Sequence, residues 1–514
     1  VHCNGYNAGS HGELPHYCIR LRIFPQSQVL MLLRRTVSVA ARRAPVWNVA
    51  IVGSGPAGFY TADQLLKGDP DVRVDIYERL PVPFGLVRYG VAPDHQDVKN
   101  VTERFHQIAS HERCSYTGNV LIGAPDATDM SAAQLPLAAL RERYNAVVLS
   151  YGASADRALG VPGEDLDGVY AARHLVEWYN GHPNAATATF NLASCETAVI
   201  VGNGNVALDC ARLLTATPDE LVGSDVAEHA AAEMVRSSLR QVVILGRRGP
   251  LQAAFTIKEL RELTKRAHAA ATLQAPADAF ATEVLEFAKK DRARKRIVEL
   301  MHKIHAPEAA DDGGTPSPPA EGQEIRIQLQ RAPKAFLPSA ASPDSLGAAL
   351  VSRTELQGPP GPSQPAVAVD GSDYELPCQL AFRAIGYRSM PIEGAPFDER
   401  RGLVPNTSGR VDGADDLYVA GWLKRGPTGV VLTNFNDGVE TAKHILEDYA
   451  TGKLGGGTDG ADAVKPLLAA QAPPTVDFEG WLRVDAEEQR RGALVRKVRE
   501  KVVTEAEMLA IACS

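Results

Sequence analysis

The sequence contains a glycine-rich turn of the kind that binds a dinucleotide. GSGPAG at 53–58 follows the apolar run 49–52 directly and precedes a stretch with helical periodicity. In such a strand–turn–helix unit Gly53 permits a tight turn, Gly55 lets the backbone approach a pyrophosphate, and Gly58 lets the helix pack on the strand. The free N–H groups at the helix N-terminus would face the phosphates. These residues therefore predict a dinucleotide site.

The next predicted strand, VRVDIYE, ends at Glu78. An acid at this place would accept hydrogen bonds from the ribose hydroxyls of an adenosine, and the position near the N-terminus favours FAD. The stretch that follows, 81–100, is rich in proline and glycine and too irregular for an ordinary crossover helix. Since it comes directly after the ribose-binding acid, we expect it to contact the flavin side of FAD.

A second turn of the same type begins at Gly202. TAVIVGNGNVAL at 197–208 gives GxGxxA, again between an apolar strand and a predicted helix. Two such units indicate two dinucleotides, which in flavoproteins are usually FAD and a nicotinamide cofactor. The strand that follows ends in Arg247 and Arg248, where NAD enzymes carry an acid. Two guanidinium groups there would bind a 2′-phosphate, so the sequence predicts NADP specificity.

Three further segments contribute to this arrangement. Apolar strands at 146–154 and 380–387 end in small residues, as is usual where a chain crosses between two nucleotide domains. The segment 415–446 reads as a strand, a turn at Gly421-Trp422 and a helix that starts near Gly429. A helix N-terminus there would stabilise negative charge on a reduced flavin, and Trp422 would cover its ring.

The composition excludes several other classes of function. A net charge of −8 over 514 residues argues against a general nucleic-acid binder. The sequence has no run of about eighteen apolar residues, which argues against a transmembrane helix. The seven cysteines include no CxxC pair, which disfavours a disulfide scaffold, a zinc site and a thioredoxin-reductase-like dithiol relay. A flavin without a dithiol can release electrons one at a time, which suits a [2Fe–2S] ferredoxin as acceptor.

The N-terminal region has the composition of a targeting segment. The first methionine is Met31, and the stretch from there to Pro45 carries four arginines and no acid. A basic, amphipathic helix of this kind is typical of a mitochondrial transit peptide, although a disordered basic tail would look similar. We therefore interpret 1–45 as a leader. Whether Met31 is the true start is left open.

Five long motifs resemble the adrenodoxin reductase family, the mitochondrial NADPH:ferredoxin oxidoreductases related to glutathione reductase. They are GSGPAGFYTA, PFGLVRYGVAPDH, GNGNVALDCARLL, GRRGPLQAAFTIKELRE and GWLKRGPTGVVLTN. The resemblance runs with interruptions from about Val49 to the C-terminus. It implies an α/β fold with two Rossmann-like domains, in which an NADP domain (153–379) is inserted into a discontinuous FAD domain (46–152 and 380–514).

The resemblance also implies roles for individual residues. Those expected at FAD are Gly53, Gly55, Ala57, Gly58, Glu78, Leu86, Ile122, Trp422, Gly429, Val430 and Val431. Those expected at NADP(H) are Asn203, Gly204, Asn205, Val206, Arg247, Arg248, Glu259 and, shared with FAD, Gly429. Low-complexity insertions at 306–323, 356–365 and 451–463 depart from the family pattern and suit surface loops.

Two residues are hypothesised to assist the chemistry. His95 would carry a proton or position a partner, or serve only as a hydrogen-bonded loop residue. Asp209 would act near the flavin or nicotinamide, or only stabilise the dipole of its helix. The candidate docking face for an acidic ferredoxin is basic, and on one helix Lys289, Arg292 and Arg296 would share a side. Further basic candidates are Arg236 and Arg240.

The sequence therefore predicts electron transfer from NADPH through FAD to a [2Fe–2S] ferredoxin. We expect this to occur in the mitochondrial matrix or at the inner membrane surface, in support of iron–sulfur cluster, haem or cytochrome P450 pathways. One alternative is an electron-input module like the small subunit of glutamate synthase, which usually carries N-terminal cysteine motifs. Another is an NADP-sensing protein with FAD as a structural element.

Overall fold

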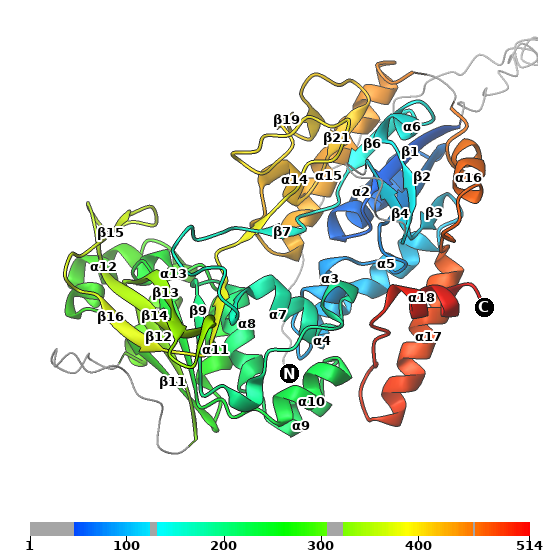
Figure 1. The fold of residues 1–514 in the computed structure, drawn as a ribbon. Helices are drawn as coiled ribbons and strands as arrows, with labels where there is room; N and C mark the ends of the chain where they lie inside the picture. Colours follow the sequence, from blue (N-terminus) through cyan, green and yellow to red (C-terminus); the bar gives the residue numbers. More distant parts are fainter. Residues whose placement is uncertain (1–45, 124–130, 306–321, 456–457) are drawn as a thin grey trace, which may run out of the picture. The chain divides into compact units, whose positions relative to one another are not determined.

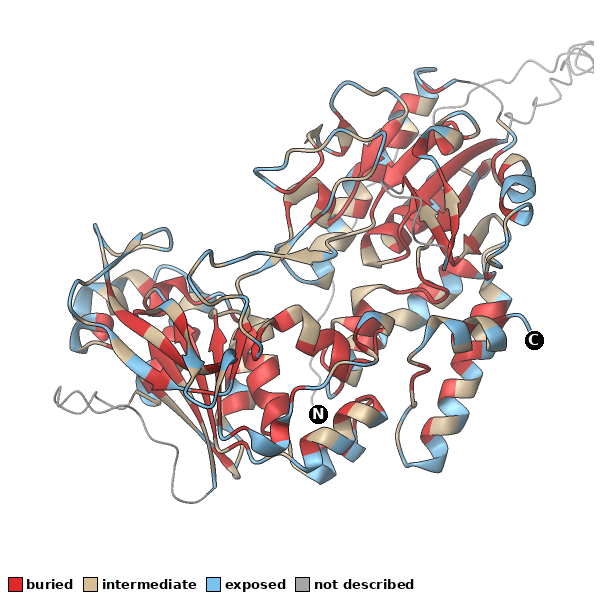
Figure 2. Cartoon of the chain, in the orientation of Figure 1, coloured by how far each residue is buried: buried red, intermediate tan, exposed pale blue. Residues whose placement is uncertain are grey.

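The computed structural model describes residues 46–123, 131–305, 322–455 and 458–514. The predicted leader and nearly all of the insertion at 306–323 lie outside these residues. Among the helices described, none is long and apolar enough to cross a membrane. The described chain contains two large sheets, and their strands form the most buried part of the molecule (Figures 1 and 2).

The first large sheet has seven strands and is parallel except at one edge. Its strands in spatial order are β19 (Asn406–Thr407), β20 (Arg410–Val411), β21 (Leu417–Val419), β6 (Ala146–Leu149), β1 (Trp47–Val52), β2 (Val72–Tyr77) and β3 (Cys114–Thr117). Every residue of β1 and β6 is buried, as expected for parallel strands covered on both faces. Helices α2 (Pro56–Gly68) and α15 (Val431–Ala450) pack closely against each other beside this sheet.

The second large sheet has six strands, all parallel. In spatial order they are β11 (Ala269–Gln274), β12 (Gln323–Leu329), β10 (Gln241–Gly246), β9 (Thr197–Val201), β17 (Leu380–Arg383) and β8 (Val169–Ala171). Its core helices are α7 (Ala172–Tyr179), α8 (Asn205–Leu214), α11 (Ile257–Thr264) and α13 (Arg292–Lys303). A smaller antiparallel sheet contains β13 (Arg331–Ser339), β14 (Ser342–Leu356), β15 (Ala366–Ala368) and β16 (Tyr374–Pro377).

The chain leaves the first sheet after β6 and returns to it after β17. The two crossing segments pair with each other as β7 (Ala155–Asp156) and β18 (Tyr387–Arg388). Because β17 pairs with β8 and β9, the boundary predicted between residues 379 and 380 falls one strand too early. An apolar run such as LAFR predicts a buried strand, but its periodicity does not say which sheet the strand joins.

Shorter elements connect and cover the sheets. On the first sheet's side they are α3 (Leu86–Tyr89), α4 (Gln96–Lys99), α5 (Val101–Ala109), β4 (Val120–Ile122), β5 (Ala133–Leu135), α6 (Leu137–Arg141), α14 (Trp422–Arg425), α16 (Ala461–Ala469), α17 (Phe478–Leu494) and α18 (Glu505–Ala512). On the second sheet's side they are α9 (Pro218–Val222), α10 (Glu228–Val235) and α12 (Thr282–Ala288). Trp481 and Met508 place the two C-terminal helices in the same core cluster as Phe59 and Phe105.

Buried charges join the two halves of the fold. Asp225, from the loop between α9 and α10, lies 2.6 Å from the Lys99 ammonium of α4 and 3.0 Å from that of Lys501. All three side chains are buried. Breaking such a buried pair is costly, because the remaining charge is left without a partner. The cluster therefore fixes α4, which lies at the end of the predicted flavin loop, against the second half of the fold.

Candidate functional site

The first glycine turn has the shape that its sequence predicts. Gly53 has φ +105°, and a Cβ there would lie 2.6 Å from the Tyr151 Cα. A Cβ on Gly58 would lie 2.2 Å from the Gly53 carbonyl oxygen. Gly55 differs, since a Cβ there would meet no described atom within 4 Å. The fold itself requires glycine at 53 and 58, whereas at Gly55 it leaves the space that a pyrophosphate would fill.

Glu78 follows β2 and points back at this turn. Its carboxylate accepts hydrogen bonds from the Ser54 backbone N–H at 2.9 Å and from the Ser54 hydroxyl at 2.7 Å. The Leu80 N–H donates to its other oxygen at 3.2 Å. The carboxylate is thus fixed beside the turn with spare acceptor capacity, which fits the ribose of an adenosine.

The predicted flavin loop lies directly on the same turn. The Phe84 N–H donates to the Ser54 carbonyl oxygen at 3.1 Å. Gly85 has φ +49°, and a Cβ there would lie 3.3 Å from the Gly55 Cα. Leu86 begins α3 immediately afterwards. The loop therefore covers the open side of the turn, where the rest of a dinucleotide would extend.

The C-terminal segment reaches the turn from the other end of the chain. Gly421 has φ +69°, and a Cβ there would lie 2.6 Å from the Ala57 Cβ. The Trp422 ring lies 5.2 Å from that of Tyr387, and its buried indole N–H has no hydrogen-bond partner among the described residues. Val430 is the N-cap of α15 and is half exposed. A buried donor and an exposed valine at a helix N-terminus fit a bound flavin ring.

The second glycine turn repeats the pattern on the other sheet. Gly202 has φ +132°, and a Cβ there would lie 2.3 Å from the Ala384 carbonyl oxygen. A Cβ on Gly204 would meet no described atom within 4 Å. The side-chain oxygen of Asn203 is buried and has no hydrogen-bond partner in the part of the chain that the structure describes, while that of Asn205 accepts from the Thr256 N–H at 2.8 Å. The chain again leaves room for a ligand at the middle glycine.

Two arginines follow β10 next to this second turn. Arg247 is exposed and Arg248 half buried, and neither has an ion-pair partner within the described ranges. Burial and the charge of Arg247 lower the pKa of Arg248. The two like charges therefore repel each other in the absence of an anion. A 2′-phosphate would supply the missing negative charge.

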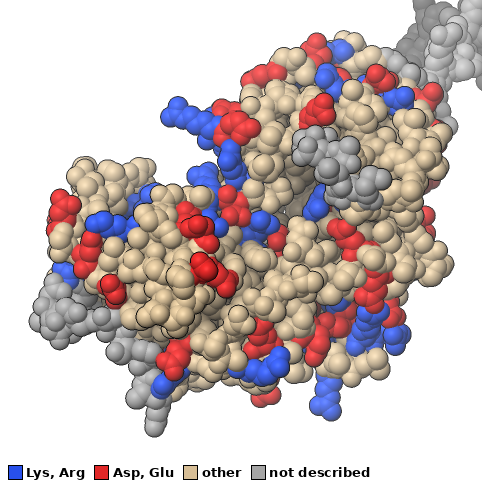
Figure 3. Space-filling model, viewed as in Figure 1, with Lys and Arg blue, Asp and Glu red and all other residues tan. Residues whose placement is uncertain are grey.

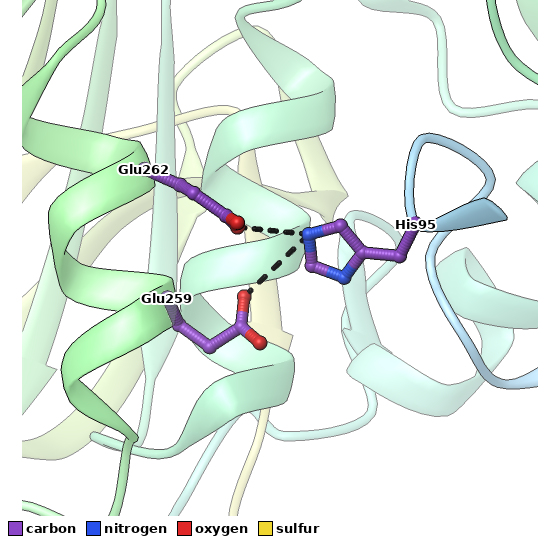
Figure 4. Close-up of side chains that lie close together, drawn as sticks. All are labelled: His95, Glu259 and Glu262. Carbon is purple, nitrogen blue, oxygen red and sulfur yellow. Dashed lines mark hydrogen bonds and ion pairs between the residues drawn. The ribbon is translucent and has the colours of Figure 1, made fainter. Parts of the chain in front are cut away.

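An acidic cluster of His95, Glu259 and Glu262 joins the flavin loop to α11 (Figure 4). The Nε2 of His95, from the flavin loop, lies 2.8 Å from Glu262 Oε2 and 3.8 Å from Glu259 Oε2, both on α11. One side-chain atom from each of His95, Glu259 and Glu262 lies within 4.8 Å of the other two, a spacing that could hold a metal ion. The carboxylates here already have cationic partners, however, because Lys258 lies 3.9 Å from Glu262 and Arg212 contacts Asp209. Burial and the neighbouring Glu259 carboxylate raise the pKa of Asp209 well above its usual range.

Asp209 therefore binds its proton more tightly in the folded state than in the unfolded chain. Its contribution to stability is greatest at acidic pH and is lost as pH rises towards the folded-state pKa. We predict that Asp209→Asn, which stays neutral, unfolds at a higher temperature than the unchanged protein at pH 7 to 8. The difference should disappear near pH 4. Thermal unfolding across this range tests the sign, with exposed Asp462→Asn as control, and a variant less stable at every pH would contradict it.

Comparisons with known proteins agree with this geometry. Residues 47–284 match the pyridine nucleotide-disulphide oxidoreductase family model. The mitochondrial NADPH:adrenodoxin oxidoreductase of Salvelinus fontinalis is 45% identical, covering 90% of this chain and 91% of that protein. The Arabidopsis thaliana protein of the same name is 42% identical, covering 91% and 95%. The chain belongs to the NADPH:adrenodoxin oxidoreductase family. It is a flavoprotein oxidoreductase that uses FAD and NADP(H).

A solved structure extends the likeness of this reductase to the fold. Mycobacterium tuberculosis FprA in complex with NADPH has a TM-score of 0.81 and 35% identity, over 91% of this chain and 100% of that one. The predicted α/β fold with two dinucleotide-binding units is confirmed. Close relatives of the reductase are mitochondrial enzymes.

The structure brings most of the predicted residues of the reductase to the two turns. Glu78 is bonded to the first turn, Ala57 lies at the start of the helix that follows it, and Leu86 follows Gly85, which approaches Gly55. Asn203 and Asn205 belong to the second turn, and the arginine pair follows Gly246, which lies beside Asn203. Glu259 lies beside His95 rather than next to the arginines. Ile122 is buried in β4, within the core cluster that includes Val52 and Tyr77.

The single helix predicted to carry Lys289, Arg292 and Arg296 is not present in this reductase. Lys289 does not share a helix with Arg292 and Arg296, because α12 ends at Ala288 and α13 begins at Arg292. The Asp291 carboxylate accepts from the Arg294 N–H at 2.7 Å and so caps a new helix. Lys289 instead pairs with Glu286. The aspartate in KKDRARKR was the sequence signal for this break.

Sequence reasoning missed several partners in the site of the reductase. Ser54 fixes Glu78, the Glu262 carboxylate lies within hydrogen-bond distance of the His95 ring, and Arg212 contacts both Asp94 and Asp209. Ser54 lies inside the glycine motif, so its hydroxyl could have been recognised from the sequence as a partner for Glu78. Glu262 and Arg212 could not be found this way, since their partners lie on elements far away in the sequence.

Proposed function

We propose that this chain transfers electrons from NADPH, through FAD, to an acidic [2Fe–2S] ferredoxin. The observation that carries the proposal is the contact between His95 and Glu262 at 2.8 Å. This contact joins the flavin loop, which lies on the first glycine turn, to α11, which follows the second glycine turn in the chain. The reacting ends of the two cofactors would therefore meet at this junction. Bound FAD would accept two electrons from NADPH and pass them on singly.

We infer the domain roles from the glycine turns. Residues 46–152 and those after the crossing strand β18 would bind FAD, and the segment between β7 and β17 would bind NADP(H). The turn N–H groups would bind the pyrophosphates, Glu78 the FAD ribose, and Arg247 with Arg248 the 2′-phosphate of NADPH. Trp422 and the Gly429–Val431 segment would lie against the flavin ring.

The acidic cluster would hold protons rather than transfer electrons. Burial and the neighbouring Glu259 carboxylate raise the pKa of Asp209 well above its usual range, which favours the protonated form of this side chain. His95 lies next to Glu259 and reaches towards the flavin loop. We propose that His95 and Asp209 orient the nicotinamide end of NADPH and keep the junction electrically balanced. Hydride transfer itself depends mainly on the relative position of the nicotinamide and flavin rings, which these two residues would help to fix.

The acceptor would dock on a local basic patch. On the face shown in Figure 3, lysines and arginines are interspersed with acids, so no broad positive surface is visible there. Arg292 and Arg296 are exposed one turn apart on α13, and Arg294 of the same helix donates to the Ala253 carbonyl oxygen. Arg236 and Arg240 remain secondary candidates, as does Lys289.

We predict that Arg292→Glu/Arg296→Glu raises the KM for ferredoxin about tenfold at low salt and leaves reduction of ferricyanide by NADPH unchanged. Like charges at a docking site slow association, and salt screens the effect. Ferredoxin-dependent cytochrome c reduction between about 20 and 300 mM salt measures it. Lys465→Glu, exposed on α16, is the control. Equal KM values at low salt would exclude α13 as the docking site.

The place of the reaction is proposed from the relatives and the leader. The relatives are mitochondrial enzymes, and 31–45 has the composition of a transit peptide. We propose the mitochondrial matrix, with the ferredoxin serving iron–sulfur cluster, haem or cytochrome P450 pathways. Import of a fusion carrying residues 31–45, compared with one lacking them, tests the location. Steady-state reduction of cytochrome c that requires both NADPH and ferredoxin tests the activity.

A further inference from the structure

A buried ion pair connects the flavin loop to a helix near the C-terminus. Arg88 of α3 donates from Nη1 to Glu488 Oε2 of α17 at 2.9 Å, and its Nη2 contacts Oε1. Arg88 is 5% exposed and Glu488 0%. A two-pronged bond of this kind fixes both side chains in direction as well as in distance.

Glu488 is itself held from two further directions. The Val502 N–H donates to Oε1 at 3.0 Å, and Arg499 donates to Oε2 at 3.3 Å. Arg499 also contacts Asp485, one turn earlier on α17. The carboxylate is therefore satisfied on both oxygens, and it does not need Arg88 to keep its own position.

The arginine is clamped by aromatic rings on its other sides. Its guanidinium carbon lies 5.1 Å from the Trp481 ring of α17 and 5.0 Å from the ring of Tyr89. Trp481 also packs edge-on against Phe84, with ring centroids 5.6 Å apart. Helix α17 thus contacts both ends of the segment 84–89, Phe84 through Trp481 and Arg88 through Glu488 and Trp481.

This segment needs outside support to keep its shape. Phe84 has φ +85°, a left-handed conformation that costs about 1–3 kcal/mol for a residue with a side chain. Such strain persists only where the surroundings impose it. Here the strained residue is the one that bonds Ser54 of the glycine turn, and Gly85 next to it approaches Gly55.

We propose that Glu488 is a positioning residue for FAD. Through Arg88 it holds residues 84–89 in the strained conformation that covers the first glycine turn, so α17 sets how tightly FAD binds. The inference rests on the assignment of that turn to FAD. It adds a residue 400 positions away in the chain from Arg88 to the cofactor site.

The test is the affinity of the stripped protein for FAD in Arg88→Lys, Glu488→Gln and Arg88→Met/Glu488→Gln, the last of which keeps an acceptor oxygen for the Val502 N–H. Arg88→Lys keeps the buried charge but loses the two-pronged bond. The double variant removes both charges together, which buried pairs often tolerate without loss of stability. If the covering conformation falls to about a tenth of the population, the dissociation constant for FAD rises about tenfold. Glu487→Gln, at a half-buried position next to Glu488 whose side chain pairs with Arg490 and Arg491, is the control and should bind FAD normally.

The readouts separate positioning from simple structural support. We expect the double variant to unfold at nearly the unchanged temperature, yet to bind FAD about tenfold more weakly and with an altered visible circular dichroism of the flavin. Unchanged FAD affinity in Arg88→Lys and in the folded double variant would overturn the proposal. If none of the proteins, including the unchanged one, binds FAD, the assignment of the turn fails instead, and with it the proposed function.

Discussion

A Gly55→Val protein is expected to fold and to be purified without FAD. The backbone at Gly55 is extended, with φ −78° and ψ −178°, so a valine meets no conformational barrier. A Cβ there would meet no described protein atom within 4 Å. The side chain would instead fill the space that a pyrophosphate needs. We predict a loss of FAD affinity of at least about 100-fold with little change in the unfolding temperature.

The matched variant is Gly204→Val on the second sheet. It also has open space at Cβ and extended backbone, with φ −121° and ψ 177°. We predict that it keeps its yellow FAD and loses the ability to be reduced by NADPH. Absorbance spectra and NADPH titrations of the two variants distinguish the sites. If Gly55→Val retained FAD, or if Gly204→Val released it, the assignment of cofactors to the two turns would be wrong.

The arginine pair should determine the choice between NADPH and NADH. Arg247→Ala/Arg248→Ala removes two charge-assisted hydrogen-bond donors, each worth about 1.5 kcal/mol at an accessible site. The preference for NADPH over NADH in kcat/KM should therefore fall about 100-fold. Almost all of the change should be in the KM for NADPH, because the 2′-phosphate lies away from the reacting ring.

The control for this experiment is Lys334→Ala, an exposed cation of β13 that pairs with Asp373. It should leave the preference unchanged. A double-alanine variant that still prefers NADPH as strongly as the unchanged protein would show that the 2′-phosphate binds elsewhere. A fall in kcat with both cofactors would indicate that the arginines act on the nicotinamide end instead.

The sequence predicted the parts of the site that lie within one local motif. The turns at Gly53 and Gly202, Glu78 and the arginine pair each follow a strand within their own unit, so spacing alone places them. Long-range partners could not be predicted. Glu488 meets Arg88, and Glu262 meets His95, only because tertiary packing brings separate elements together.

The two errors have similar physical causes. The boundary predicted before Leu380 precedes a strand that pairs with β9, because an apolar run carries no information about its neighbours. The helix over 289–296 was predicted as continuous because its charges repeat at helical spacing, while the capping preference of Asp291 breaks it. In each case, an interaction outside the pattern decided the structure.

Anaerobic stopped-flow absorbance of the FAD-bound protein tests the central claim most directly. The protein is mixed with NADPH or NADH, and the reduced protein is then mixed with an acidic [2Fe–2S] ferredoxin. We predict that NADPH bleaches the flavin rapidly, that NADH does so far more slowly, and that ferredoxin restores the yellow colour in one-electron steps. A flavin that NADPH reduces but ferredoxin never reoxidises would contradict the proposed acceptor.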